Sequence, residues 1–421
     1  MLTVKLARIK SITLWSAIAI ALGSCASPAP NSSPQAQQSP AAPPQVNQSP
    51  VGGKFTVGLV MIGPKNDGGW SQAHYEGLEY VTQKLPDVGI EYVDKVNPSD
   101  RPNVKGSQIG DDLIAKGAKM VIFNSDDLKD DALETAKKHP NVTVIHASGD
   151  YAWQEGKNFK NQLNLGNVMP QMEYGRAIAG CAAALSSETG KIGFLGPLIN
   201  DETRRLVSAG YLGSKYCWET YRKKPPQELQ FKVTWIGFWF NIPGQTLDPT
   251  KVADDFYNGG FDVVMSGLDT PEVAVQGKKA AEAGKKVKFL HYTLKSGCDF
   301  APDICLGVPV YNWGPAYLES VKQTQAGNFK SEFVWAKPDW KDLNNPDTSA
   351  VGFVKGKALS AENQKFLEQF IQGVGDGSIN LYKGPLNFQD GSVFLKEGET
   401  ATPPQIWYMP QLLQGIEGSS K

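Results

Sequence analysis

The sequence predicts an α/β protein with two lobes, each built on a doubly wound parallel sheet, with a hinge and a cleft between the lobes. From residue 54 onward, short apolar runs rich in β-branched residues alternate with helix-like segments, as in parallel sheets covered by helices. The alternation starts afresh near residue 190. The runs "GLVMIGP" and "KIGFLGP" each end in Gly-Pro before a loop and a helix, so we interpret them as the first strands of two similar lobes.

In the first lobe, the strand "FTVGLVMI" precedes a helix over 70–85, in which apolar residues recur at helical spacing. The strand "IEYVDKV", a helix over 105–116, the strand "KMVIFNS", a helix over 127–138 and the strand "VTVIHAS" continue the pattern. Because crossovers between parallel strands are right-handed, these elements predict one parallel sheet with helices on both faces.

The second lobe begins with the helix "MEYGRAIAGCAAALSS". The strands "KIGFLGP", "FKVTWIGFW", "FDVVMSG" and "VKFLHYT" then alternate with helices over 202–217, 249–258 and 271–283. The run "GVPVYNW" and a helix over 315–326 are expected to return to the first lobe, and the chain ends in a hairpin, "GPLNFQDGSVFLKEG", and a closing strand. The predicted bounds are 54–168 with about 291–345 for the first lobe, and 169–290 with about 346–421 for the second.

Residues 1–24 predict a lipoprotein signal peptide. Lys5, Arg8 and Lys10 precede "ITLWSAIAIALG", an apolar run too short to span a bilayer but suited to the core of a secretory signal. The run ends in "LGSC", which resembles the lipobox of bacterial lipoproteins, where cleavage precedes a cysteine that is then acylated. Cys25 is therefore the expected lipidation site, and the alternative is an ordinary signal peptide followed by an incidental cysteine.

Residues 25–53 predict a disordered tether. The segment is almost wholly Ala, Ser, Pro, Gln and Asn, and it cannot bury enough apolar surface to offset the entropy of ordering it. No later segment is long and apolar enough to span a membrane. We therefore expect a lipid-anchored protein of the cell envelope that faces the periplasm or the cell exterior and touches the membrane through its anchor alone.

The overall charge indicates no macromolecular partner of one sign. The chain has 42 Lys and Arg residues against 43 Asp and Glu residues, so it lacks the basic field that nucleic-acid binding requires. Specificity must therefore come from a local site, and we expect a small-molecule ligand and a monomeric protein.

Four cysteines follow Cys25. Cys298 and Cys305 bracket the short loop "DFAPDI" and could form one disulfide, which leaves Cys181 to pair with Cys217; the alternative is four separate buried thiols. The spacing contains no CxxC pair and no associated histidine, so it indicates neither a zinc site nor any other metal or cofactor.

The sequence matches none of the common catalytic or nucleotide-binding motifs considered below. "GLVMIGPK" approaches a phosphate-binding loop, but Pro64 occupies the position where that motif requires lysine, and no Ser or Thr follows. No GxGxxG, HExxH or GxSxG motif occurs. The four histidines, at positions 74, 139, 146 and 291, are interpreted as structural, so the sequence does not predict an enzyme.

Acidic and aromatic residues gather at the predicted strand ends. Because ligands bind outside the carboxyl ends of parallel strands, these side chains are expected to converge on one cleft. Together they suit a flat polar ligand that stacks between rings and is recognised at its edges, as a nucleobase would be. The acidic candidates are Asp67, Asp126 and Asp269, and the aromatic candidates are Trp70, Trp239, Phe240, Tyr292 and Trp313.

Several longer stretches resemble the basic membrane protein family. These are "NDGGWSQAHYEGL", "YGRAIAGCAAALSSETGKIGFLG", "GGFDVVMSGLD" and "MPQLLQGIEG", and the resemblance extends over nearly all of 54–418. Members are lipid-anchored substrate-binding proteins of ABC importers, related to the purine nucleoside receptor. The resemblance implies a periplasmic-binding-protein fold of type I, like that of sugar-binding proteins, without catalytic activity. It also implies a purine-like ligand between the lobes and, as partners, the permease and ATPase subunits of an importer.

The resemblance also implies roles for individual residues. The Asn-Asp pair of the family's first loop matches Asn66 and Asp67 as polar contacts to the purine, and the aromatic residue of that loop matches Trp70 as a stacking residue. Trp239 would close the stack from the other side. Polar residues at strand ends match Ser125, Asp126 and Asp269.

One departure from the family bears on the ligand. Nucleoside-binding members tend to carry a "GvD" stretch with a nearby lysine after the next strand, where this chain has "LHYTLK". This difference and the Trp-rich strand ends favour a nucleobase or related heterocycle over a nucleoside. The alternatives are a receptor of the same fold for a sugar or another small solute, a ligand sensor, and an exported nucleoside hydrolase.

Overall fold

The computed structural model describes residues 47–48 and 55–421. The expected signal peptide, Cys25 and almost all of the expected tether lie outside these residues. Within the part that is described, no helix combines the length and the apolar character needed to cross a membrane.

The first lobe is a seven-stranded sheet. Its strand order is β1-β3-β2-β4-β5-β6-β12, and all neighbouring strands are parallel except β1, which runs antiparallel to β3. In chain order the strands are β1 (Asn47–Gln48), β2 (Phe55–Val60), β3 (Val88–Val93), β4 (Ala118–Phe123), β5 (Thr143–Ala147), β6 (Leu165–Pro170) and β12 (Phe333–Ala336).

The second lobe is also a seven-stranded sheet. Its order is β13-β11-β10-β9-β7-β8-β16, parallel throughout except for β13, which runs antiparallel to β11. The strands are β7 (Lys191–Gly196), β8 (Gln230–Trp235), β9 (Val263–Ser266), β10 (Lys288–Leu290), β11 (Cys305–Tyr311), β13 (Val351–Lys355) and β16 (Ile416–Glu417). The predicted hairpin is present as β14 (Leu386–Asn387) and β15 (Val393–Leu395).

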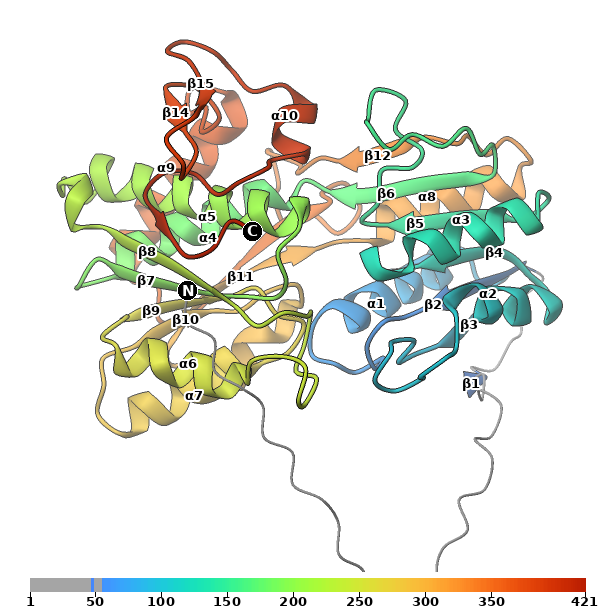
Figure 1. The fold of residues 1–421 in the computed structure, drawn as a ribbon, viewed down its shortest axis with the longest axis horizontal. Coiled ribbons are helices and arrows are strands. Elements are labelled where there is room, and N and C mark those ends of the chain that lie inside the picture. Colours follow the sequence, from blue (N-terminus) through green and yellow to red (C-terminus); the bar gives the residue numbers. More distant parts are fainter. Residues whose placement is uncertain (1–46, 49–54) are drawn as a thin grey trace, which may run out of the picture. The chain divides into compact units, whose positions relative to one another are not determined.

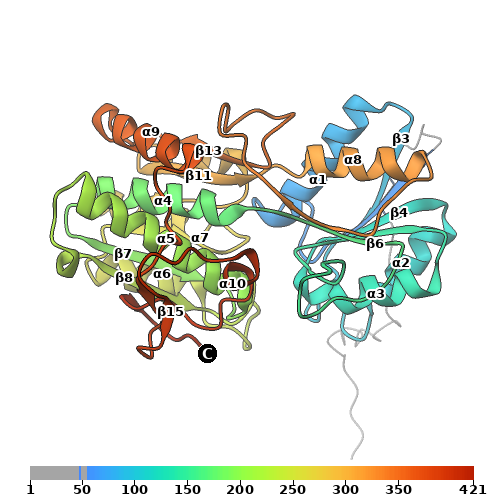
Figure 2. The same ribbon diagram turned by 90° about the horizontal axis from the view of Figure 1, so that it is seen from above.

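Helices cover both faces of each sheet, as Figures 1 and 2 show. On the first sheet, α1 (Trp70–Lys84) packs beside α8 (Gly314–Gln325) on one face, and α2 (Gly106–Ala115) beside α3 (Lys129–Lys138) on the other. On the second sheet, α4, α5 and α9 pack together on one face, and α6 packs beside α7 on the other. The bounds of these five helices are α4 (Met172–Ser186), α5 (Asp201–Thr220), α6 (Pro249–Asn258), α7 (Glu272–Glu282) and α9 (Ala361–Asp376).

The chain passes between the lobes three times: after β6, after β11 and after β12. The second of these passages lies later in the chain than the predicted lobe boundary. The chain was expected to return to the first lobe at about residue 291, with the run "GVPVYNW" as one of its strands. Instead, this run forms most of β11, which pairs with β10 and β13 in the second sheet. Every residue of β11 is buried, so its sequence marks a central strand without showing to which sheet it belongs. The chain returns to the first lobe only at α8.

Two close-packed helices, α4 and α5, support the cleft-facing side of the second lobe. A Cβ atom on Gly180 would lie 1.9 Å from the carbonyl oxygen of Gly210, and one on Gly213 would lie 2.0 Å from that of Ala177. The glycines therefore allow the two backbones to touch. A disulfide between Cys181 and Cys217 joins the same helices, and a second disulfide joins Cys298 to Cys305.

Candidate functional site

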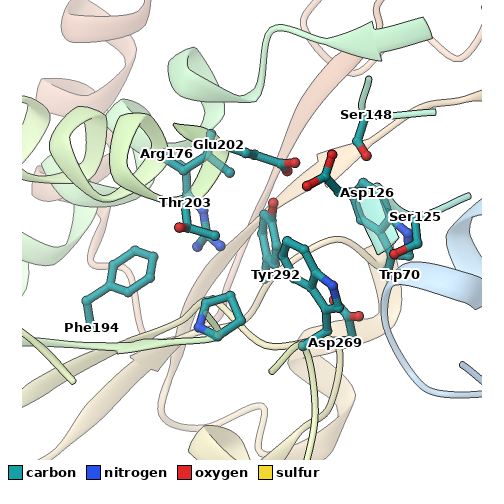
Figure 3. Close-up of a pocket in the computed structure, with 14 residues that line it drawn as sticks. Trp70, Ser125, Asp126, Ser148, Arg176, Phe194, Glu202, Thr203, Asp269 and Tyr292 are labelled. Carbon is teal, nitrogen blue, oxygen red and sulfur yellow. The ribbon is translucent and has the colours of Figure 1, made fainter. Parts of the chain in front are cut away.

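A pocket lies between the two lobes at the carboxyl ends of their strands. It holds about 470 Å³ of space free of protein atoms, part of it open to solvent. Figure 3 shows its acidic and aromatic side chains directed toward one another. The pocket is lined by Trp70, Ser125, Asp126, Ser148, Arg176, Phe194, Pro197, Glu202, Thr203, Leu206, Trp239, Gly267, Asp269 and Tyr292.

Trp70 forms a firmly held aromatic wall of the pocket. Its indole nitrogen donates a hydrogen bond to the carbonyl oxygen of Asn124, and its ring meets those of Tyr311 and Trp313 edge to face, at centroid distances of 5.1 and 5.3 Å. Tyr292 is held in turn by a 2.7 Å hydrogen bond between its hydroxyl and that of Tyr311. Because packing and hydrogen bonds hold these rings, little side-chain entropy is lost when a flat molecule stacks against them.

Three carboxyl groups line the pocket, at Asp126, Glu202 and Asp269. Burial raises the pKa of Glu202 to about 7, although the Arg205 charge opposes the shift. Burial also raises the pKa of Asp269 well above its usual range, and the neighbouring charges of Asp67 and Glu202 add to that effect. Near neutral pH such groups can donate as well as accept hydrogen bonds, so they suit the mixed donor and acceptor edge of a neutral ligand.

The loop before α1 contacts the second lobe closely. A Cβ atom on Gly69 would lie 2.1 Å from the carbonyl oxygen of Asp269, so only glycine permits this approach. Beside it, Nε2 of His291 lies 3.2 Å from the carbonyl oxygen of Gly68. The loop therefore serves as a contact between the lobes at the edge of the pocket.

Six of the nine predicted ligand residues line this pocket. They come from the first turn of α1 and from the ends of β4, β8, β9 and β10. The six are Trp70, Ser125, Asp126, Trp239, Asp269 and Tyr292.

The other three positions lie outside the lining of this pocket, and their predicted contact with a ligand stays a prediction. Asp67 caps α1 instead: its carboxylate accepts hydrogen bonds from the backbone N–H groups of Gly69, Ser71 and Gln72 at 2.8, 2.8 and 3.1 Å. Asn66 is exposed to solvent outside the pocket lining.

Trp313 is buried in the core behind Trp70, where it stacks on His74 with a centroid distance of 4.0 Å. An aromatic residue just after a strand is as well suited to a core as to a site, and here the Trp70 ring stands between Trp313 and the pocket.

Several pocket residues were not foreseen from the sequence. Half of them lie on α4 and α5, which approach the pocket from the second lobe, and the other half lie in β7 or just after β5, β7 and β9. The one available signal was Arg176, a charged residue directly before the apolar run "AIAGCAAAL". The unforeseen residues are Ser148, Arg176, Phe194, Pro197, Glu202, Thr203, Leu206 and Gly267.

The part of the chain that the structure describes contains no cluster of three or more His, Cys, Asp or Glu side chains that could hold a metal ion. The pocket carboxylates are spread over α5 and the ends of β4 and β9, and they face aromatic rings. Their arrangement suits hydrogen bonding to an organic molecule.

Sequence comparison relates the chain to transport proteins. The family described as ABC transporter substrate-binding protein PnrA-like, or Bmp, matches residues 54–372. A purine-binding protein of Brucella abortus is 26% identical over 374 residues, which cover 86% of this chain and 93% of that protein. A putative ABC transporter glucose-binding protein of Haloferax volcanii is 26% identical over 277 residues, which cover 66% of this chain and 62% of that protein.

Solved structures of similar fold include ABC transporter solute-binding proteins. One, from Aeropyrum pernix, superposes with a TM-score of 0.60 at 11% identity and covers 79% of this chain and 93% of its own. Another, from Conexibacter woesei, has a TM-score of 0.56 at 15% identity and covers 77% of this chain and 97% of its own. At these identities the likeness concerns the fold, which is the predicted two-lobed solute-binding architecture.

Proposed function

Because the chain belongs to the family of PnrA-like ABC transporter substrate-binding proteins, we propose that it captures a purine between its lobes and delivers it to a permease. The ligand we favour is a nucleobase or a nucleoside-like heterocycle. Proteins of this family bind transport substrates outside the cytoplasm and are not enzymes.

The observation that carries the purine proposal is the combination of flat rings and carboxyl groups in one narrow pocket. Trp70 and Tyr292 offer aromatic surfaces, while Glu202 and Asp269 offer polar groups at the edge. A purine has two apolar faces and an edge of N–H donors and ring-nitrogen acceptors, so stacking and edge recognition can operate together. A site built around such an edge disfavours molecules that leave its buried groups without partners.

The relationship to the purine-binding protein of Brucella abortus supports the same ligand class, because the similarity extends over 93% of that protein. The putative glucose-binding protein of Haloferax volcanii is similar over a shorter region, and this similarity makes a sugar the second candidate. Phe194, Pro197 and Leu206 make part of the lining apolar, which favours a heteroaromatic ring over a molecule with hydroxyl groups on every side.

A second, more polar cavity adjoins the pocket and leaves room for a nucleoside. The two share Asp126, Ser148 and Glu202, and the second holds about 700 Å³ of atom-free space that is open to solvent. Asn158 and Arg205 are among the side chains that could bond sugar hydroxyl groups there. A nucleobase would use the first pocket alone, whereas a nucleoside would occupy both.

Capture is expected to work by closure of the lobes over the ligand. Contacts between the lobes, such as that of Gly69 with Asp269, border the same pocket that would hold the purine. A ligand that touches both lobes binds the closed form more tightly than the open form and so shifts the population toward it. Release to a permease then requires reopening.

A thermal-shift screen tests the proposed ligand class. The protein would be heated with adenine, guanine, hypoxanthine, adenosine, guanosine, glucose and ribose, each at a large excess. Because a ligand that binds only the folded state stabilises it by mass action, a purine should raise the unfolding midpoint by several degrees. Stabilisation by sugars without any effect of the purines would overturn the proposal.

We also propose that Cys25 carries the lipid anchor and that the protein acts as a monomer. Radiolabelled palmitate should be incorporated into the wild-type protein in its host and not into Cys25→Ser. Incorporation that survives this substitution would rule out the anchor at Cys25.

A further inference from the structure

A buried arginine, Arg176, lies at the side of the pocket formed by α4. Its side chain is only 1% exposed, and Nη1 donates a 2.6 Å hydrogen bond to the carbonyl oxygen of Ser266. The guanidinium carbon lies 3.4 Å from the ring centroid of Tyr292 and 5.0 Å from that of Phe194. Figure 3 shows the guanidinium nitrogens beside Tyr292 at the pocket.

The hydrogen-bonding capacity of Arg176 is only partly used. Its Nε is buried and has no hydrogen-bond partner. Over residues 55–421, no carboxylate lies within ion-pairing distance of its guanidinium, whereas the nearby Arg205 has Glu173 at 3.9 Å. A buried guanidinium with one hydrogen bond and no paired carboxylate is costly, so such a group at a pocket wall indicates that a ligand supplies a further acceptor.

Arg176 also differs in kind from the other polar groups of the pocket. The carboxyl groups of Glu202 and Asp269 can change between donor and acceptor by taking up a proton. A guanidinium keeps its proton in proteins and offers donors alone. Arg176 therefore offers the pocket only hydrogen-bond donors, whatever the pH.

We propose that Arg176 is a specificity residue of this pocket, donating hydrogen bonds to an acceptor on the purine edge, either an unprotonated ring nitrogen or a carbonyl oxygen. This inference rests on the proposed function, because it takes the ligand to be a purine. The ring would stack beside Trp70 while its acceptor edge faces α4. A ligand with C–H at the recognised position leaves Arg176 without an acceptor and is disfavoured.

Analogues that lack single acceptors locate the recognised atom. Adenine would be compared with 1-deazaadenine, 3-deazaadenine and 7-deazaadenine, and hypoxanthine with unsubstituted purine, by calorimetric titration of the wild-type protein. One of these changes should weaken binding roughly ten- to a hundredfold, the range for a hydrogen bond to a charged group. Similar affinity for every analogue and its parent would overturn the inference, without the need for any variant.

Two variants complete the test. In Arg176→Met, the sensitive analogue and its parent should bind with the same affinity, whereas Arg176→Lys should recover part of the discrimination. Arg222→Met is the matched control, because Arg222 donates to the carbonyl oxygens of Ala184, Leu185 and Ser187 at the far end of α4, outside the pocket lining. It should discriminate as the wild type does.

The outcomes separate this inference from the proposed function. If the wild-type protein binds none of the purines, the proposed function fails and the inference fails with it. If purines bind but Arg176→Met, shown to be folded by its thermal unfolding, still discriminates among the analogues as the wild type does, only the role of Arg176 is overturned.

Discussion

The indole nitrogen of Trp239, in the second lobe, donates a hydrogen bond to Oδ2 of Asp127, in the first lobe. Trp239 also lines the pocket. One side chain therefore belongs both to the lining of the candidate site and to the contact between the lobes, so occupancy of the pocket and closure are expected to reinforce each other.

Removing this contact should speed ligand release. In Asp127→Ala the indole of Trp239 loses its acceptor, and a hydrogen bond of this kind contributes about 0.5–1.5 kcal/mol, or roughly a two- to tenfold change in affinity. The change should appear in the dissociation rate, measured by stopped-flow tryptophan fluorescence with a bound purine. Asp112→Ala, at an exposed position of α2, is the control. Equal dissociation rates in Asp127→Ala and the wild type would contradict this role.

Gly69→Ala should hinder closure. The added Cβ would lie 2.1 Å from the carbonyl oxygen of Asp269, so the closed form must shift, while an open form has no such clash. We expect purine affinity to fall more than tenfold and the ligand-induced decrease in the radius of gyration, measured by X-ray scattering, to be lost. In Gly210→Ala the nearest atom would lie 3.5 Å from the new Cβ, so this variant should compact normally. Normal compaction of Gly69→Ala would refute the prediction.

Asp67→Ala should affect stability more than binding. Its carboxylate caps the N-terminus of α1, and loss of such a cap costs about 0.5–2 kcal/mol of unfolding free energy. Urea denaturation should show this decrease, while calorimetry should show purine affinity within about threefold of the wild type. Asn66→Ala, at the exposed neighbouring position, should change neither quantity. Unchanged stability with a large loss of affinity would restore the sequence-based hypothesis that Asp67 contacts the ligand.

Glu202→Gln should change the pH dependence of stability in the ligand-free protein. Burial raises the pKa of Glu202 from 4.5 to about 7, so the folded state binds this proton more tightly than the unfolded state. The resulting stabilisation is complete below pH 4.5 and is lost as the pH rises through about 7.

The variant cannot ionise at this position, so its unfolding free energy relative to the wild type should increase from pH 4 to pH 8. Urea denaturation at intervals across this range measures the difference. Glu228→Gln, at an exposed position, should give a difference that does not vary with pH. An equally flat profile for Glu202→Gln would show that burial does not perturb Glu202 in this way.

Much of the fold could be predicted from the sequence, because alternating strands and helices leave a strong periodic signal. The elements that were missed carry weaker signals. β6, "LGNVMP", contains glycine, asparagine and proline, which reduce strand propensity, yet it is buried throughout and pairs with β5 and β12. β12, β13 and α9, all in the last third of the chain, were also not predicted. Periodicity likewise could not show to which sheet β11 belongs.

The site was predictable only in part. Residues at strand ends, such as Asp126 and Asp269, could be found because parallel strands bring their carboxyl ends to one edge. Arg176 and Glu202 could not, because they reach the pocket from helices whose orientation depends on the packing of α4 against α5. Asp67 was predicted from its place after a strand, but that place suits a ligand contact and a helix cap equally well. In the structure its carboxylate accepts hydrogen bonds from backbone N–H groups at the start of α1.

The proposed function requires that the pocket between the lobes bind a purine. Calorimetric titration of the wild-type protein and of Trp70→Ala with adenine, guanine and glucose measures this binding. We predict one purine bound per chain by the wild type, and affinity at least a hundredfold weaker in Trp70→Ala, which loses the stacking wall of the pocket. Binding of glucose with no heat from either purine, or unchanged purine affinity in Trp70→Ala, would contradict the account.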